Sequence, residues 1–140
     1  MSKKKQKNLM SEEQRLLLRW TMDLACYLSK KYEMEKKAAL EKAHLNRKLM
    51  MYLGDGVVVF VYEEEDGTIR EARGTLLKGI SKAFDAWMRK KGKEDKAPAK
   101  WPRGNFVYWD LDEEAFRSWN ASRLIKIKAY TAINCLHDKQ

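Results

Sequence analysis

Apolar residues recur at helical spacing in the first third of the chain and follow a strand-like pattern from residue 57 onward. Ser11-Glu-Glu-Gln is a capping-box pattern, and an apolar stripe with spacings of three and four follows it, which predicts a helix over residues 11–30. A less apolar helical stretch covers residues 33–53, with the break between the two helices at residues 29–32. The two helices are expected to form an αα-hairpin.

Residues 57–77 predict a β-hairpin. They consist of two β-branched and aromatic stretches separated by Asp66-Gly67, which is a strong two-residue turn signal. Such a turn sets a register in which Phe60 faces Arg73, and it divides the side chains between two faces. The face expected to point into a core holds Val57, Val59, Val61, Ala72, Gly74 and Leu76. The other face holds Val58, Phe60, Tyr62, Glu71 and Arg73, and it is expected either to meet a partner or to lie beneath the N-terminal helices.

An insertion interrupts the β pattern between residues 78 and 104. Its first half has one apolar face and predicts a short amphipathic helix up to Gly92, and the polar lysine-rich stretch after Gly92 predicts a flexible loop. Strand signals then resume in two segments, followed by a 3₁₀ turn and a last strand, at residues 105–110, 115–119, 120–123 and 124–128. Five short strands with a turn before the last favour a small barrel.

The predicted fold is therefore α+β: an αα-hairpin followed by a five-stranded SH3-like β-barrel with an inserted helix and basic loop. The predicted parts are a disordered basic tail, the helical hairpin, the barrel with its insert, and a C-terminal extension, at residues 1–10, 11–53, 55–128 (insert 78–104) and 129–140. A hydrophobic content of 44% in 140 residues is enough for one cooperative unit with a core.

The net charge of +9 is concentrated in two segments. Residues 2–8 contribute +4, and residues 78–104 contribute nine positive and three negative charges, while the remainder of the chain sums to −1. Clustered Lys and Arg residues gain affinity for a polyanion by releasing counterions from its phosphates. A solubilising tail and a solvated loop explain the same charges equally well.

Enzymatic, metal-binding and membrane-spanning functions find no support in the sequence. Two cysteines and two histidines lack any metal-ligand spacing, the carboxylates cluster in predicted turns, and no nucleophile or phosphate-binding motif occurs. We therefore expect no catalysis, no metal and no cofactor. The longest apolar run, Val57 to Tyr62, is far shorter than the roughly 20 residues that cross a bilayer, and no signal peptide is recognisable. The expected location is the cytoplasm.

Two stretches carry a family resemblance: V-F-V-Y-E-E-E-D-G-T-I-R-E-A-R-G-T-L at residues 59–76 and F-V-Y-W-D-L-D-E-E-A-F-R-S-W-N-A-S-R-L-I at residues 106–125. Over about residues 53–127 the chain resembles an uncharacterised family of small SH3-like β-barrel proteins, common in Bacteroides-type gut bacteria and in their phages and mobile elements. The second stretch is also similar, more weakly, to the end of WYL-type barrels. Such domains occur in transcriptional regulators and phage-defence proteins and sense nucleic acids or nucleotides, although the W-Y-L tripeptide is absent here.

Two functions are compatible with these features. The first is a nucleic-acid-binding accessory protein of a bacterium, phage or mobile element, which contacts DNA or RNA through basic residues beside aromatic ones. Its candidate residues are Lys3, Lys4, Lys5, Arg70, Arg73, Arg89, Lys90, Lys91, Lys93, Lys96, Lys100, Arg103, Arg117 and Arg123. The second is a protein-interaction module, such as a phage structural component or an inhibitor of host machinery. Its candidate residues are Trp20, Tyr27, Phe60 and Tyr62. Structural roles remain an equal alternative, with Trp109 and Trp119 filling the core, Arg70 paired to Glu63 and Arg73 covering Phe60.

Overall fold

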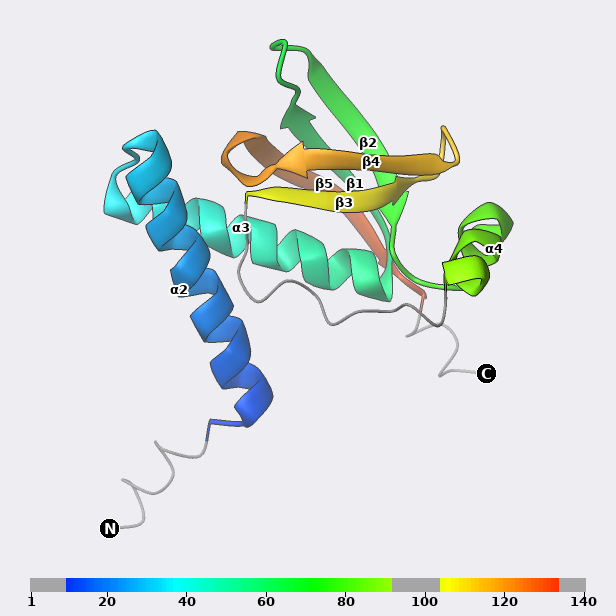
Figure 1. The fold of residues 1–140 in the computed structure, drawn as a ribbon, viewed down its shortest axis with the longest axis horizontal. Helices are drawn as coiled ribbons and strands as arrows, with labels where there is room; N and C mark the ends of the chain where they lie inside the picture. Colours follow the sequence, from blue (N-terminus) through cyan, green and yellow to red (C-terminus); the bar gives the residue numbers. More distant parts are fainter. Residues whose placement is uncertain (1–9, 92–103, 134–140) are drawn as a thin grey trace.

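The computed structural model describes residues 10–91 and 104–133, which form two helices, a five-stranded antiparallel sheet and a shorter helix (Figure 1). The elements in chain order are α2 (Glu12–Tyr32), α3 (Lys36–Asp55), β1 (Gly56–Glu63), β2 (Ile69–Thr75), α4 (Lys82–Lys91), β3 (Asn105–Asp110), β4 (Ala115–Asn120), η2 (Ala121–Arg123) and β5 (Leu124–Ala132). The strand order is β4-β3-β2-β1-β5, so the predicted α+β class is confirmed. None of the helices in the described ranges has a stretch long and apolar enough to cross a membrane.

The capping box predicted at Ser11 begins α2. The Ser11 hydroxyl accepts from the Gln14 amide at 3.0 Å, and the Gln14 side chain accepts from the Ser11 amide at 2.9 Å. The break between the helices lies at residues 33–35 rather than 29–32, because Glu33 adopts a left-handed conformation (φ 52°) and Glu35 is the N-cap of α3. A core of leucines and alanines then joins α2 to α3: Leu24, Ala25, Leu28, Ala39 and Ala43.

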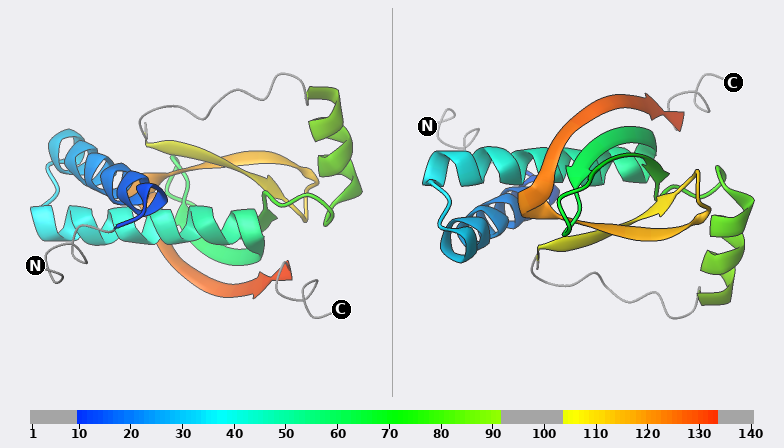
Figure 2. Two further views of the ribbon diagram at one scale, coloured as in Figure 1. Left: turned by 90° about the horizontal axis from the view of Figure 1, so that it is seen from below. Right: turned by 90° about the horizontal axis from the view of Figure 1, so that it is seen from above.

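The main core lies between α3 and the concave side of the sheet. Leu49 and Leu53 of α3 pack against a set of buried side chains from the strands: Val58, Phe60, Tyr62, Ala72, Tyr108, Trp119 and Leu124. Figure 2 shows α3 running along the curved sheet, with α2 at one end of α3 and α4 at the other end of the molecule. The barrel core is therefore closed by a helix that comes from outside the barrel sequence.

The predicted hairpin register is wrong by one residue. Phe60 pairs with Ala72, and Val59 pairs with Arg73. The loop contains three residues, because the Glu64 amide donates to Thr68 O at 2.8 Å and the Gly67 amide donates to Glu64 O at 2.9 Å. This is a type I turn followed by a glycine bulge, with Gly67 at φ 91°. A shift of one residue moves every β1 side chain to the opposite face.

The consequence of this register is that the β1 faces are exchanged relative to the prediction. Phe60 and Tyr62 are 0% and 3% exposed and lie in the core, together with Val58. Val57 and Val59, which were expected inside, are only half-buried, whereas Val61, also expected inside, is buried. On β2, Ala72 is buried and Arg73 is exposed, as predicted, because charged and small residues alternate along this strand and indicate which face is buried.

A buried amide ties α3 to the far side of the barrel. Asn46 of α3 is fully buried, its Oδ1 accepts from Trp119 Nε1 at 2.8 Å, and its Nδ2 donates to Ala121 O at 3.1 Å. These bonds satisfy polar groups that burial would otherwise leave unpaired. A second link is the parallel stack of Tyr52 of α3 on Tyr130 of β5, with centroids 3.8 Å apart. Tyr130 lies beyond the predicted end of the last strand at residue 128, because β5 continues to Ala132.

Candidate nucleic-acid interface

α4 is held on the outer face of β3 and β4 by an aromatic cluster. Phe84 of α4 lies 5.4 Å from Trp109 and 6.0 Å from Phe116, measured between ring centroids. Trp87 lies 4.7 Å from Phe116 in an edge-on arrangement. Trp109 and Phe116 face each other across the β3–β4 pair, and Phe84 is 2% exposed. Aromatic pairs of this geometry add stability to the burial of apolar surface, so α4 has a fixed position on the barrel.

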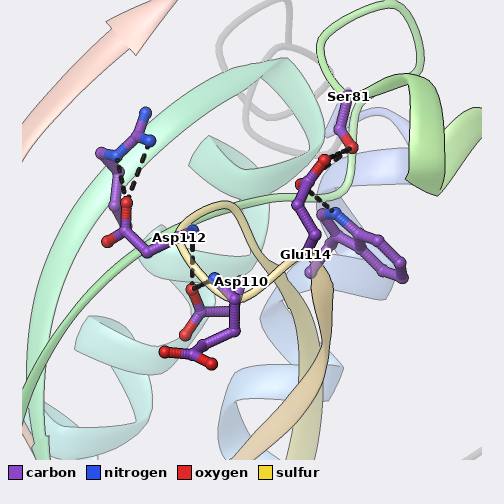
Figure 3. A network of polar contacts seen from close by, with 7 residues as sticks. Ser81, Asp110, Asp112 and Glu114 are labelled. Carbon is purple, nitrogen blue, oxygen red and sulfur yellow. Dashed lines mark hydrogen bonds and ion pairs between the residues drawn. The ribbon is translucent and has the colours of Figure 1, made fainter.

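A carboxylate also fastens the start of α4 to the β3–β4 turn (Figure 3). Both carboxylate oxygens of Glu114 accept from the Ser81 hydroxyl at 3.0 Å, and one of them accepts from Trp109 Nε1 at 3.0 Å. The turn itself is shaped by Asp110, whose Oδ1 accepts from the amides of Asp112 and Glu113 at 2.9 and 3.0 Å. The predicted polar turn therefore has a specific role, because it anchors the inserted helix.

The docked helix presents a basic surface to solvent. Lys82, Arg89 and Lys90 are exposed, and Lys91 ends the helix. Residues 78–91 contain five basic side chains and one acidic one, Asp85. The Asp85 carboxylate accepts from the Gly79 amide at 3.1 Å. A rigid helix with clustered cations is the kind of surface that attracts phosphate groups.

The four barrel arginines predicted to contact nucleic acid bind neighbouring groups of the protein instead of forming one open face. Their partners are Glu64 for Arg70, Asp112 for Arg73 at 3.0 Å, Asp110 for Arg117 at 3.3 Å, and the Glu64 carbonyl for Arg123 at 2.7 Å. The expected pairing of Arg70 with Glu63 and the expected cover of Phe60 by Arg73 are both wrong, because of the register shift. The carboxylates offset most of this positive charge locally.

The aromatic residues predicted to contact a protein partner are engaged within the molecule. Phe60 and Tyr62 lie in the core beneath α3, so this face is covered by an N-terminal helix, as one of the two alternatives expected, and does not meet a partner. Trp20 packs on Phe106 with centroids 5.6 Å apart, and Tyr27 meets Tyr32 edge-on at 6.4 Å. The predicted residues Lys3, Lys4, Lys5, Lys93, Lys96, Lys100 and Arg103 lie outside the described ranges.

A second part of the surface has the opposite charge. The β1–β2 turn carries Glu63, Glu64, Glu65 and Asp66, and these line a cavity of about 370 Å³ together with Arg123 and residues of β3 and β4. In Figure 1 this turn projects away from α4. An acidic surface repels phosphates, so this turn is an unfavourable place for a polyanion. Within the described parts of the chain, no group of three His, Cys, Asp or Glu side chains is placed to hold a metal ion.

The barrel interior contains a pair of tyrosines that titrate abnormally. The hydroxyls of Tyr62 and Tyr108 lie 2.8 Å apart and share a hydrogen bond. Burial raises the pKa of both phenols, and the bond to Tyr62 raises the pKa of Tyr108 further. A raised pKa in the folded state means that the folded protein favours the protonated phenols. The contribution of these phenols to the free energy of unfolding is therefore fully present below the unfolded pKa of about 10. It is lost as the pH rises through the folded pKa values.

We predict that Tyr62 and Tyr108 will not ionise with the other tyrosines in an alkaline titration. Ultraviolet absorbance of tyrosinate should show a late fraction that appears only with unfolding, and the free energy of unfolding should fall above about pH 10. Tyr108→Phe should cost about 1 kcal/mol at neutral pH, because it leaves the Tyr62 hydroxyl without its partner. Tyr32→Phe, at an exposed tyrosine, is the control and should leave the late fraction unchanged. A late fraction that survives in Tyr108→Phe at full size would contradict the assignment.

The sequence predicted α4 and its cations, but it did not predict the aromatic and carboxylate contacts that hold α4 on the sheet. The structural alternative puts Trp109 in the barrel core together with Trp119, whereas only Trp119 lies there and Trp109 lies on the outer face of the sheet beneath α4. The alternation of Phe106, Tyr108 and Trp119 with Trp109 and Phe116 is the signal that both faces of the β3–β4 pair are covered. Glu114 and Asn46 carried no signal, because their partners lie far away in the sequence.

Comparison with known proteins gives one finding on fold. A family model described as WYL_2, with an Sm-like SH3 β-barrel fold, matches residues 46–125. The match begins at the buried Asn46 in α3 and ends in β5, and it therefore includes the whole barrel up to the start of its last strand. The search of curated proteins found no match. The search of solved structures also found no match.

Proposed function

The chain belongs to the WYL_2 family of Sm-like SH3 β-barrels, and from this premise we propose that it is a small, non-catalytic module that binds DNA or RNA through α4. A barrel of this kind fits an accessory or binding role. The narrower expectation, an accessory protein of a bacterium, phage or mobile element, rests on the resemblance of the two strand segments and is part of the proposal.

One observation carries the proposal. The exposed cations Lys82, Arg89 and Lys90 lie on α4, whose other side is held on the sheet by the aromatic cluster and by Glu114. Cations on a fixed scaffold lose less conformational freedom on binding than cations on a loose segment. The sequence after α4 adds Lys93, Lys96, Lys100 and Arg103 against Glu94 and Asp95, which increases the local positive charge.

The aromatic component of the surface is Trp87. Its side chain is 39% exposed, and Lys90 follows it by three residues, which places Lys90 on the next turn of α4. Phosphates are proposed to contact the lysines and arginine, while a base stacks on the indole, a combination typical of single-strand binding. Double-stranded DNA would use the phosphate contacts alone.

The proposal predicts that Arg89→Glu/Lys90→Glu weakens binding at least about tenfold at low salt and reduces the slope of log K against log salt by about 2. Fluorescence anisotropy with labelled single-stranded DNA, double-stranded DNA and RNA across a salt series measures both quantities. Lys37→Glu/Lys48→Glu is the matched control, because it makes the same charge change at exposed positions of α3. It should change affinity by no more than about threefold.

Two results would overturn the proposal. One is the absence of binding to all three nucleic acids at low salt. The other is an equal loss in the α4 variant and the α3 control, since this would show that only the total charge matters. Circular dichroism should show unchanged folding in both variants, because all four substituted side chains are exposed.

A further inference from the structure

α2 and α3 enclose an apolar groove on the flank of α2 that does not contact the barrel. The groove has a volume of about 430 Å³ and is lined by Met22, Ala25, Cys26, Ser29, Lys30, Lys36 and Leu40. Trp20 packs on Phe106 from one flank of α2. Successive helical residues are rotated by about 100°, so Met22 and Cys26 lie on the opposite flank from Trp20. The groove is therefore separate from the packing of α2 on β3.

Exposed apolar side chains extend the groove toward the start of α2. Leu18 and Met22 are 49% and 48% exposed, and Cys26 is also exposed. These three residues are spaced by four, which places them on one side of α2 over two turns. Methionine adapts its shape readily to a partner surface. An apolar strip of this length along a groove between two helices matches the apolar face of a third helix.

The charges around the groove indicate the chemistry of that third helix. The two charged residues that line the groove, Lys30 and Lys36, are both cations, and both are exposed. Asp23, Glu35 and Glu41 are next to lining residues in the sequence, but none of these acids lines the groove, and Glu35 accepts from the Ala38 amide as the N-cap of α3. A second copy of this chain is the alternative occupant, and the sedimentation measurement described below separates it from a different protein.

We propose that this groove binds an acidic amphipathic helix of another protein. The apolar side chains of that helix would contact Met22, Ala25 and Leu40, and its carboxylates would face Lys30 and Lys36. This goes beyond the binding of nucleic acid, because α2 and the start of α3, which line the groove, lie at the opposite end of the molecule from α4 (Figure 2). Both surfaces can be occupied together, so the module would connect a nucleic acid to a protein.

The test uses the full chain and two fluorescein-labelled model helices of about 21 residues. Both have leucines at helical spacing on one face, and the other positions are mainly glutamate in one peptide and mainly lysine in the other. In fluorescence anisotropy the glutamate helix should bind at least about tenfold more tightly than the lysine helix. Lys30→Glu/Lys36→Glu should reverse this preference. In NMR spectra the glutamate helix should shift the methyl signal of Met22.

Met22→Glu should weaken binding of the glutamate helix at least about tenfold. The substitution places a carboxylate among the apolar side chains of the groove, and this carboxylate repels the glutamates of the peptide. Leu16→Glu is the matched control, since Leu16 is an even more exposed leucine (63%) on the Trp20 flank of α2. It should leave the affinity within about threefold of that of the unmodified chain. Both sites are exposed, so both variants should fold.

Four outcomes would overturn the proposal: equal binding of the two peptides, an equal effect of Leu16→Glu and Met22→Glu, methyl shifts confined to other residues, and self-association in sedimentation that Met22→Glu abolishes. The last outcome would identify the groove as a contact between copies of this chain. Nucleic-acid binding should be the same in Met22→Glu and in the unmodified chain, so the two proposals can fail independently.

Discussion

Phe60→Ala is expected to lower the free energy of unfolding by about 4 kcal/mol, as measured by urea or thermal denaturation. Phe60 is fully buried and lies 4.9 Å from Tyr108 and 5.6 Å from Trp119, measured between ring centroids. Removing the ring leaves a cavity at the centre of the barrel, and the rigid strands around it cannot close it completely. The aromatic contacts of the other rings are lost at the same time.

Val59→Ala is the matched control, one residue away in the same strand. Val59 is half-buried on the outer face, so the substitution should cost about 1 kcal/mol or less. The register expected from a two-residue turn makes the opposite prediction, with the large loss at Val59 and a small one at Phe60. The ratio of the two losses therefore decides between the two registers. A larger loss in Val59→Ala would show that the register in the structure is wrong.

The register could not be read from the sequence for two physical reasons. Asp66-Gly67 fits a two-residue turn, yet a glycine is also what a three-residue loop with a bulge requires at its last position. Hydrophobic alternation normally decides between such registers, but every residue from Val57 to Tyr62 is apolar and gives no preferred face. The strands themselves were predicted within a few residues, because composition and turn signals locate a strand without fixing its orientation.

The candidate interface was predictable in part. Its cations stand close together in the sequence, so a local excess of charge revealed them, and the apolar face of α4 followed from helical periodicity. The contacts of the barrel arginines with other protein groups could not be predicted in the same way. Arg73 and its partner Asp112 are 39 residues apart, and Arg123 and Glu64 are 59 residues apart. Such contacts depend on the register and curvature of the sheet, so they become visible only in three dimensions.

The α3–β1 junction shows how one small residue determines the closure of the barrel. Gly56 ends α3 through a hydrogen bond from its amide to Tyr52 O, and it begins β1 opposite Ala132 of β5. Its backbone is extended (φ 174°), so conformation alone would allow any residue there. Space does not allow it, because a Cβ atom would lie 1.9 Å from the carbonyl oxygen of Thr131.

Gly56→Ala is therefore expected to lower the free energy of unfolding by about 3 kcal/mol, since relief of the clash requires β5 to move away from β1. Gly54→Ala is the matched control two residues earlier. A Cβ at Gly54 meets nothing within 4 Å, and the residue lies in α3, so alanine should stabilise the protein by about 0.5 kcal/mol. Thermal denaturation should therefore show a lower melting temperature for Gly56→Ala and a higher one for Gly54→Ala than for the unmodified chain. A neutral effect of Gly56→Ala would show that β5 does not approach β1 this closely at residue 56.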